Sequence, residues 1–539
     1  MAERVMEQIG NSIRAKDMHI HRLRTTIGEG AAHETGRRDR RRTAALKMGC
    51  VVLAAACRLA AGAVPGFTVT DFGAAGNGKI LDTPSIQKAI DAAAAAGGGT
   101  VVLPPGRFLT GTIFLRSHVT LELQSGATLL GSRDIKDYPL MQKGIGTDND
   151  HSGRYLIVAS GVEDVTICGG GLIDGQGDAF WEPAADPRKW IKAKSPRPSP
   201  MVEVSGSKDV HIRDVRLTNP AGWTMNLRTS ERVFVRNISI KNNPLAPNSD
   251  GIDVSGSRDV LISDSRVDTG DDGIVLNSVD RDVERVTVSN CVIRSLCAAL
   301  KVGWPGNKHN IRQVAISNCV LFGSNRGVAV YHPGPGAVVE DVVVSNIVFD
   351  SNTPVVLTRP IHIDLRRTPG AAEAGRIRNV SISNFTARTQ GRVLMTAEAG
   401  TVLENITLRD VHLTYPYLED PRQLGANPAS DQCSNRSPEA RVATAAVVAE
   451  NIENLEIDGL TVTWPEGPAP EEWRIPVKRE NGTFDRLYNF EYGTVAPPDF
   501  SVIWARGIRS GTVRMTNLRG SSAKVKALDI LNSGVKILE

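Results

Sequence analysis

The sequence is poor in aromatic residues and has no long, uninterrupted apolar segment. Phe, Trp and Tyr make up 5% of the 539 residues, whereas Gly occurs 51 times. Few large side chains and many small or β-branched ones suit thin stacked coils better than one thick core. The longest apolar run, residues 48–64, is short and interrupted by Arg58, so we expect no stable membrane span.

Cysteine is also scarce, with seven residues in the chain. Cys291 and Cys319 stand at the same place in two similar segments, VSNC and ISNC. This repetition favours small inward-facing residues that stack on one another over a disulfide. No spacing of Cys and His resembles a zinc site, and we expect no cofactor and no metal.

Charge is concentrated at the amino terminus. Residues 1–63 hold 12 of the 63 Lys and Arg but 6 of the 59 Asp and Glu, which leaves residues 64–539 close to neutral. The basic run at 37–42, the apolar run and the small residues at 61–63 are typical of an export signal, and RRTAALK at 41–47 resembles a twin-arginine signal. We therefore predict a periplasmic or secreted protein whose mature part begins near residue 64. The alternative is that the segment is a buried helix that caps the fold.

The neutral body gives no support for a nucleic-acid partner, and we expect a monomer that binds a polysaccharide or oligosaccharide. Length does not require two domains, because repeat folds grow by adding turns. We assign residues 64–539 to a single domain.

Short β-branched segments recur along this domain at intervals of roughly 23 to 28 residues, the length of one turn of a right-handed parallel β-helix. Asn or Asp often closes each segment, where it favours a tight turn. Examples are DVHIRDVRL, RVFVRNISI, DVLISDSRV, RVTVSNCVI, QVAISNCVL and DVVVSNIVF. The sequence predicts an all-β, right-handed parallel β-helix.

An amphipathic helix is predicted from Ile86 to Ala95, with Asp82 or Thr83 near its cap and Gly97–Gly99 as its stop. Such a helix is suited to covering the open end of a stacked sheet. Longer intervals between the segments predict loop insertions near 138–155, 181–200, 351–376, 415–444 and 465–498. SVIWARGIRSGTVRMTNL, from Ser501, is expected to form the final coil.

The stretch from Asn248 to Ser278 contains a repeated tripeptide. Asp250-Gly251-Ile252 recurs as Asp272-Gly273-Ile274, and Asp271 precedes the second copy. If the two copies are one coil apart, Asp250 and Asp272 stack about 4.8 Å apart. Clustered carboxylates repel one another, which raises the pKa of at least one and lets it act as an acid while the others act as bases. Such a group can break a glycosidic bond.

Several phrases resemble glycoside hydrolase family 28, the polygalacturonases and their relatives. They are VTDFGAAGNGKILDT (69–83), GGGLIDGQGDAFW (169–181), NPAGWTMNL (219–227), NSDGID (248–253) and TGDD (269–272). The resemblance implies a right-handed β-helix and inverting hydrolysis without a metal. It also implies that Asp271 is the general acid, that Asp250 and Asp272 hold and deprotonate the attacking water, and that Asn248 orients them.

Two motifs of that family are absent. Where the polygalacturonases have Gly-His-Gly this chain has Cys297-Ala298-Ala299, and where they have Arg-Ile-Lys it has Ala329-Val330-Tyr331. The missing Arg and Lys are expected to clamp a uronate carboxylate. Their absence argues against plain homogalacturonan as the substrate.

Counting by coil places Trp223, Asp250, Asp272, Ala298 and Arg326 in one file, and Asp253, Val275, Lys301 and Ala329 in another. Arg326 either binds a sugar carboxylate or hydroxyl or forms a surface salt bridge. Lys301 either binds substrate or neutralises Asp253. The aromatic residues Trp304, Tyr331 and His332 either stack on sugar rings or pack under a loop.

We therefore predict an exported glycoside hydrolase that cleaves a pectin-like or related polysaccharide or oligosaccharide by an inverting acid/base mechanism. One alternative is a polysaccharide lyase, which would need a base and a group, often calcium, that neutralises a uronate. The other is a non-catalytic carbohydrate-binding β-helix.

Overall fold

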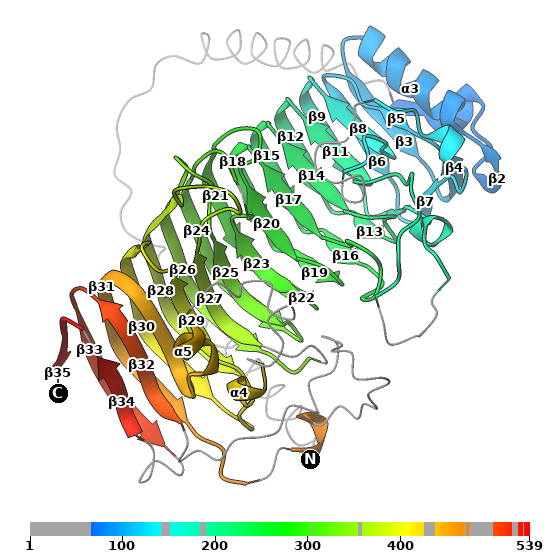
Figure 1. The fold of residues 1–539 in the computed structure, drawn as a ribbon. Helices are drawn as coiled ribbons and strands as arrows, with labels where there is room; N and C mark the ends of the chain where they lie inside the picture. The colour runs from blue at the N-terminus through cyan, green and yellow to red at the C-terminus, as the bar shows by residue number, and fades with distance from the viewer. Residues whose placement is uncertain are drawn as a thin grey trace, which may run out of the picture. The chain divides into compact units, whose positions relative to one another are not determined.

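The computed structural model describes residues 66–141, 151–183, 190–305, 307–353, 358–424, 437–467, 470–473, 500–519, 526–531 and 533–538. The predicted export signal lies outside these residues. Strands run across a long stack of coils, and each strand pairs in parallel with its counterparts on the neighbouring coils (Figure 1). Three such ladders follow the stack, so the predicted parallel β-helix is confirmed.

The first ladder carries the residues singled out in the sequence. It consists of β5 (Ile113–Phe114), β8 (Ile157–Ser160), β11 (Val202–Ser205), β14 (Met225–Arg228), β17 (Ile252–Ser255), β20 (Ile274–Asn277), β23 (Ala298–Val302), β25 (Arg326–Tyr331), β27 (Arg359–Leu365), β29 (Val393–Ala397), β31 (Ala445–Thr463), β32 (Ser501–Ile508) and β34 (Lys526–Leu531).

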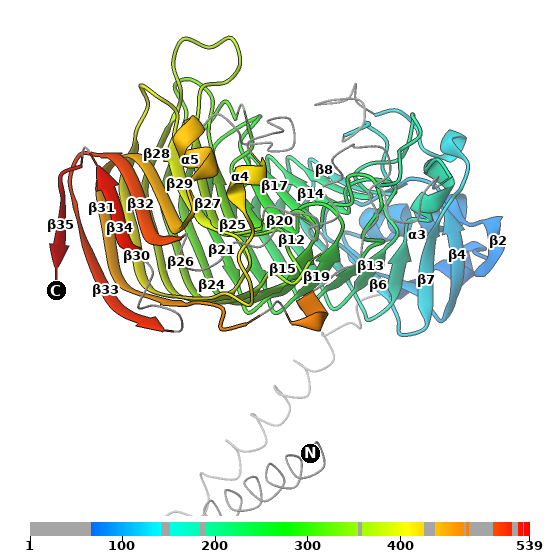
Figure 2. The same ribbon diagram turned by 60° about the horizontal axis from the view of Figure 1, so that its bottom comes forward.

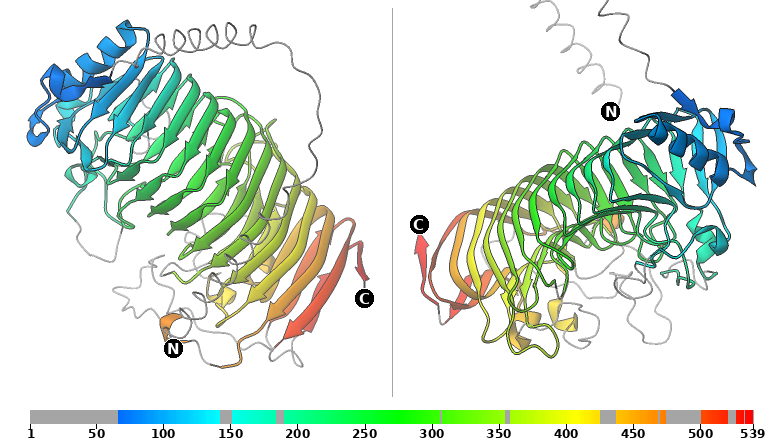
Figure 3. Two further views of the ribbon diagram at one scale, coloured as in Figure 1. Left: turned by 180° about the vertical axis from the view of Figure 1, so that it is seen from behind. Right: turned by 90° about the horizontal axis from the view of Figure 1, so that it is seen from above.

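The second ladder runs along the back of the stack (Figure 3). It consists of β1 (Gly66–Thr68), β3 (Gly99–Leu103), β6 (Val119–Leu123), β9 (Glu163–Cys168), β12 (Lys208–Arg213), β15 (Glu231–Arg236), β18 (Arg258–Ser263), β21 (Val283–Ser289), β24 (Ile311–Phe322), β26 (Val338–Asp350), β28 (Arg376–Arg388), β30 (Leu403–Thr414), part of β31, β33 (Gly511–Arg519) and β35 (Val535–Leu538).

The third ladder is built of short strands before it joins β24. It consists of β2 (Asn77–Leu81), β4 (Gly106–Thr110), β7 (Ala127–Gly131), β10 (Leu172–Asp174), β13 (Arg216–Thr218), β16 (Ser239–Lys241), β19 (Arg266–Thr269) and β22 (Val292–Ser295), and it continues into the second half of β24.

The core fills the inside of the coils with stacked aliphatic residues. One file of valines runs through β15, β18, β21, β24, β26 and β28, all in register and nearly inaccessible: Val233, Val260, Val286, Val314, Val342 and Val380. Cys291 and Cys319 are buried free thiols in this stack, as the sequence predicted. Period-two burial of β-branched residues therefore builds a thin, continuous core.

Helix α3 (Thr83–Ala95) begins three residues earlier than predicted and turns Ile86, Ala89 and Ile90 inward. It packs against β1, β3 and β5 at the amino-terminal end of the stack (Figures 1 and 2). The Asp82 carboxylate does not cap the helix. It accepts hydrogen bonds from the backbone N–H groups of Ala75 (2.6 Å) and Gly76 (3.1 Å) and so holds the preceding turn.

The remaining short helices are η1 (Val69–Phe72), η2 (Ile135–Asp137), η3 (Gly177–Phe180), α4 (Pro421–Leu424), α5 (Pro438–Val442) and η5 (Glu471–Trp473). Among the described residues, none of the helices has the length and apolar character needed to cross a membrane.

Two predicted boundaries differ from the structure. Residues 359–365, which the sequence suggested as part of an insertion, form β27 and pair in register with β25 and β29. The segment from Ser501 is not the final coil, because β34 and β35 continue the ladders beyond it. In both places the irregular spacing of the segments concealed a regular strand.

A ladder of Asn side chains links the neighbouring strands β24, β26 and β28. Asn318, Asn346 and Asn384 each adopt a left-handed backbone with φ near 50°. The amide of Asn346 donates to Asn318 Oδ1 at 2.9 Å and accepts from Asn384 Nδ2 at 2.7 Å. Asn tolerates this conformation better than other non-Gly residues, which explains why Asn recurs at this place inside β24, β26 and β28.

We predict that Asn346→Ala lowers the free energy of unfolding by about 1–3 kcal/mol, because it loses two side-chain hydrogen bonds and leaves Ala with a positive φ. Asn346→Gly should lose less, since Gly adopts that φ without strain. Urea unfolding of the three proteins provides the comparison. Equal stability of the Ala variant and the wild type would show that the amide ladder contributes nothing.

Candidate active site

The repeated Asp-Gly-Ile phrases lie on adjacent coils, just before β17 and β20. Ile252 is opposite Ile274, and the N–H of Gly251 donates to the carbonyl of Asp272 at 2.9 Å, so Asp250 stacks on Asp272 as predicted. A Cβ at Gly251 would lie 2.3 Å from the Gly273 carbonyl oxygen. The glycines therefore allow the coils to approach closely beside the carboxylates.

Asp272 is buried and its two carboxylate oxygens have different partners. The N–H of Ala298 donates to Oδ1 at 2.9 Å, and Lys301 Nζ lies 2.5 Å from Oδ2. Burial opposes ionisation of Asp272, but the positive charges of Lys301 and Arg326 hold its pKa below the usual value. Asp272 is therefore the ionised member of the cluster.

Asp250 has the opposite environment. It is 2% exposed, and its Oδ1 has no hydrogen-bond partner among the described residues. Burial, followed by the charges of Asp271 and Asp253, raises the pKa of Asp250 well above its usual range. Asp271 is half-buried, and burial and the charge of Asp272 raise its pKa as well. One cluster thus contains carboxyls pushed toward different protonation states.

Lys301 belongs to this cluster through Asp272, not through Asp253 as one reading of the sequence suggested. Val275 stands between Asp253 and Lys301 in the register of β17, β20 and β23. The Lys301 ammonium also lies 3.6 Å from the ring centroid of Trp304, which is 38% exposed. Trp304 is the predicted aromatic residue that keeps an accessible surface.

Arg326 is buried beyond Ala298 in the same file as Asp272, as the register predicted. Its guanidinium donates to Tyr331 Oη at 2.6 Å, and that hydroxyl lies 3.1 Å from His362 Nδ1. Tyr331 is 2% exposed, so it offers no open face to a sugar ring. It supports Arg326.

His332 is also buried, and its Nδ1 lies 4.0 Å from the Asp364 carboxylate. Arg366 Nε is 3.3 Å from its Nε2. Burial, reinforced by the charge of Arg366, lowers the pKa of His332 to about 3, so this ring is neutral. The His332 ring is buried, so it does not offer the sugar-stacking face that the sequence suggested.

Asn248 is held by a residue that sequence reasoning missed. Its Oδ1 accepts from the Arg197 guanidinium at 2.9 Å, and Arg197 also donates to the carbonyls of Ala221 (2.7 Å) and Pro247 (3.1 Å). Arg197 is 1% exposed although it belongs to a predicted loop insertion. Nothing in its local sequence marks this long-range role.

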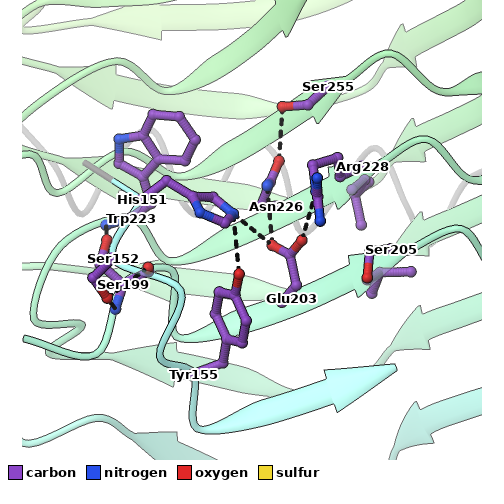
Figure 4. A network of polar contacts seen from close by, with 12 residues as sticks. His151, Ser152, Tyr155, Ser199, Glu203, Ser205, Trp223, Asn226, Arg228 and Ser255 are labelled. Carbon is purple, nitrogen blue, oxygen red and sulfur yellow. Dashed lines mark hydrogen bonds and ion pairs between the residues drawn. The ribbon is translucent and has the colours of Figure 1, made fainter. Parts of the chain in front are cut away.

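A second polar group missed from the sequence lies on the amino-terminal side of the carboxylates (Figure 4). Glu203 accepts from Asn226 Nδ2 and Arg228 Nε, both at 3.0 Å, and lies 3.4 Å from His151 Nε2. Extending the file of Asp253 backwards by two coils would have found Asn226 and Glu203.

Among the described residues, Asp271, Asp272 and Cys297 bring three possible metal ligands within 4.8 Å of one another. Both oxygens of Asp272 are already taken, by Lys301 and by the N–H of Ala298. A divalent cation would have to displace the Lys301 ammonium and would lie beside its positive charge. This donor set is a poor fit for a cation.

Residues 100–444 match the model of glycosyl hydrolases family 28. A probable polygalacturonase of Vitis vinifera is 33% identical over 221 residues, which cover 39% of this chain and 44% of the relative. An exo-poly-alpha-D-galacturonosidase of Dickeya chrysanthemi is 33% identical over 251 residues, which cover 38% of this chain and 41% of the relative. The chain thus spans less than half the length of these two curated relatives.

The fold comparison agrees. The crystal structure of a hyperthermoactive exopolygalacturonase from Thermotoga maritima is similar with a TM-score of 0.54 at 23% identity, and the similarity covers 65% of this chain and 88% of that one. At this identity the likeness establishes the parallel β-helix architecture.

We predict that Asp250→Asn raises the free energy of unfolding by about 1–3 kcal/mol near pH 7, because the substitution removes a carboxyl whose pKa is raised on folding by burial and by neighbouring carboxylates. Because folding raises this pKa, the fold loses stability as the pH rises from the unfolded-state pKa of Asp250 to its folded-state pKa. The gain should therefore shrink as the pH falls and Asp250 becomes protonated.

Urea unfolding near pH 7 and near pH 4 measures this difference. Asp268→Asn is the control: Asp268 pairs with Arg294 at 3.1 Å, so its loss should not stabilise the protein. A stability gain for Asp250→Asn that does not vary with pH would contradict the electrostatic explanation.

Proposed function

Since the chain belongs to glycosyl hydrolases family 28, we propose that it hydrolyses O-glycosidic bonds of a pectin-like or related polysaccharide or oligosaccharide by an inverting acid/base mechanism. The observation that carries this proposal is a cluster of carboxyls on adjacent coils whose pKa values are raised at Asp271 and Asp250 and lowered at Asp272, beside an Asp250 oxygen with no partner among the described residues. Opposed pKa values divide acid from base roles in glycosidases.

In this mechanism Asp271 is the general acid. Its raised pKa keeps a proton available for the leaving glycosidic oxygen, and its half-buried side chain remains accessible to substrate. Proton donation allows the bond between the anomeric carbon and that oxygen to break without releasing an alkoxide.

Asp272 and Asp250 act on the attacking water. Asp272 is ionised and accepts the proton of the water as it adds to the opposite face of the sugar. Asp250 Oδ1, which has no partner among the described residues, holds the water by a hydrogen bond. Inverting enzymes usually have acid and base roughly 6.5–9.5 Å apart, with the water between them. The carboxylate oxygens of Asp271 and Asp272 approach within 4.8 Å, so in this proposal the water is held toward Asp250 on the adjacent coil.

Lys301 and Asn248 position this group. Lys301 holds Asp272 ionised and is itself fixed over Trp304, while Asn248 is oriented by Arg197. Because the Lys301 ammonium is occupied, Arg326 is the stronger candidate for binding a sugar carboxylate or hydroxyl. Tyr331 fixes Arg326, His332 supports the neighbouring coil through Arg366, and Trp304 offers the face on which a sugar ring stacks.

The substrate differs from plain homogalacturonan in this proposal, because Ala329 and Tyr331 stand where an Arg and a Lys are expected to clamp a uronate carboxylate, and Ala298 stands where the family has a His. Both alanines are buried and pack with Tyr331. The named relatives act, by their names, on galacturonan. We further propose that residues 1–63 direct export, which brings the enzyme to extracellular polysaccharide.

We predict that Asp271→Asn lowers the release of reducing sugar by about 100- to 10,000-fold, the usual contribution of a general acid, without changing the melting temperature by more than a few degrees. The assay uses a panel of pectin-derived oligosaccharides with chromatographic product analysis. Asp268→Asn, three residues away on β19, is the matched control and should keep wild-type turnover.

Retained activity in Asp271→Asn would remove this assignment. Products with the ultraviolet absorbance of an unsaturated uronate would instead indicate elimination by a lyase. Binding across the panel with no turnover by the wild type would favour the non-catalytic alternative.

We also predict that dialysis against excess EDTA leaves hydrolysis unchanged, because Lys301 supplies the positive charge that a cation would otherwise provide at Asp272. Activity before and after dialysis is the measurement. Loss of turnover that added Ca²⁺ restores would show that a metal takes part.

A further inference from the structure

The polar group around Glu203 lies where a substrate chain would continue past the carboxylates. In the register of the first ladder, Glu203 is opposite Asn226 and Asn226 is opposite Asp253. Trp223, just before β14, stands one coil from Asp250. Parallel strands are about 4.8 Å apart. Trp223 and Asn226 therefore lie one coil from the coil of Asp250, and Glu203 lies two coils from it.

His151 closes this side. Its ring is 2% exposed, with Nε2 3.4 Å from both Glu203 Oε2 and Tyr155 Oη, and it meets the indole of Trp223 edge-on at 6.3 Å (Figure 4). A sugar chain that follows the first ladder toward β11 therefore reaches the His151 ring within about 10 Å of the Asp250 coil. The His151 ring therefore limits how far a sugar chain can extend on this side of Asp250.

The closure is held in place by the backbone. The N–H of Ser152 donates to the Ser199 carbonyl at 2.9 Å, and the N–H of Trp223 donates to Ser199 Oγ at 3.1 Å. Arg197 joins the same segment to the Ala221 and Pro247 carbonyls. The segments that carry His151 and Ser199 are therefore fixed to the coils on which Trp223 and Asn248 lie.

The charges on this side are predominantly acidic. Arg228 is paired with Glu203 at 3.0 Å and with Asp280 at 3.6 Å, and Arg197 is the second arginine on this side. Asp253 is buried one coil beyond Asn226. The three carboxylates of Glu203, Asp253 and Asp280 outnumber the two arginines, so a sugar carboxylate here would be repelled.

On the opposite side of the carboxylates, toward β25 and β27, the side chains include positive charges. Lys301 lies on Asp272, and Arg326 and Arg359 are opposite one another on β25 and β27. A carboxylate is therefore favoured toward β25 and disfavoured toward β11. Charge complementarity of this kind fixes the direction in which a substrate binds.

Two buried polar atoms on the acidic side have no partner among the described residues: His151 Nδ1 and Asp250 Oδ1. Buried polar groups are normally hydrogen-bonded, and an orphaned one is destabilising. Sugar hydroxyls can both donate and accept, so a sugar bound here can satisfy both atoms.

We propose that Trp223, His151, Glu203, Asn226 and Arg228 form a terminal subsite that takes one uncharged sugar residue, so that the enzyme removes single units from a chain end. This inference rests on the proposed hydrolase function for its catalytic consequence. The binding preference itself does not need turnover.

The test compares two oligogalacturonide trimers. In one, the residue at the non-reducing end keeps its carboxylic acid, and in the other this acid is reduced to an alcohol. A second pair of trimers carries the same difference at the reducing end. Binding is measured by titration calorimetry to the Asp271→Asn variant. We expect one carboxyl-reduced trimer to bind at least tenfold more tightly than the unmodified trimer. Glu203→Gln in the same background should narrow that ratio, because it removes one negative charge.

His151→Ala should weaken binding of the preferred trimer and let the active enzyme release products longer than one sugar. His211→Ala is the matched control: that ring stacks on Phe234 at 4.6 Å on the second ladder and should change neither result. Melting curves identify variants that fail to fold, and His151→Gln then replaces His151→Ala.

Equal or tighter binding of the unmodified trimer, or no binding of any trimer, overturns the terminal subsite. So does release of mixed product lengths by the wild type from the first time point. A tenfold binding preference without hydrolysis by the wild type rejects the proposed function and leaves the subsite standing.

Discussion

The hydrogen-bonded register between successive coils is the constraint on which the site depends. It sets Ile252 opposite Ile274 and Val275 opposite Lys301, and so brings residues about two dozen positions apart in the chain to neighbouring strands. A slip of one residue would turn these side chains to the other face of the strand. Gly251 and Gly273 allow the close backbone approach at the point where the acids lie.

Burial gives this cluster its chemical character. Carboxyls on adjacent coils repel each other, and each would be easier to accommodate in water than under the neighbouring side chains. Lys301 offsets the repulsion at Asp272 alone and leaves the carboxyls of Asp250 and Asp271 with raised pKa values. The stability given up at Asp250 is the kind of strain that functional sites retain.

The ladder also gives the site a direction. Toward β11 the side chains are acidic and closed by His151, and toward β25 and β27 they include buried arginines. Family 28 membership accounts for the carboxylates. Ala298 and Ala329 depart from the motifs expected of polygalacturonases, and Lys301 and Arg326 lie in the same two files as these alanines. Selectivity in this chain therefore depends on residues outside the shared phrases.

The sequence by itself determined the architecture and the acids. A spacing of β-branched segments, with Asn at their ends, is a local and repeated signal, and counting coils placed Asp250, Asp272 and Arg326 in one file. Only the tertiary structure decided their partners. Lys301 pairs with Asp272, and Tyr331 is buried against Arg326. Arg197 and His151 come to the site from segments outside the strands. Periodicity specifies which residues share a face, whereas the direction of a long side chain and the path of a loop follow from packing against residues distant in the chain.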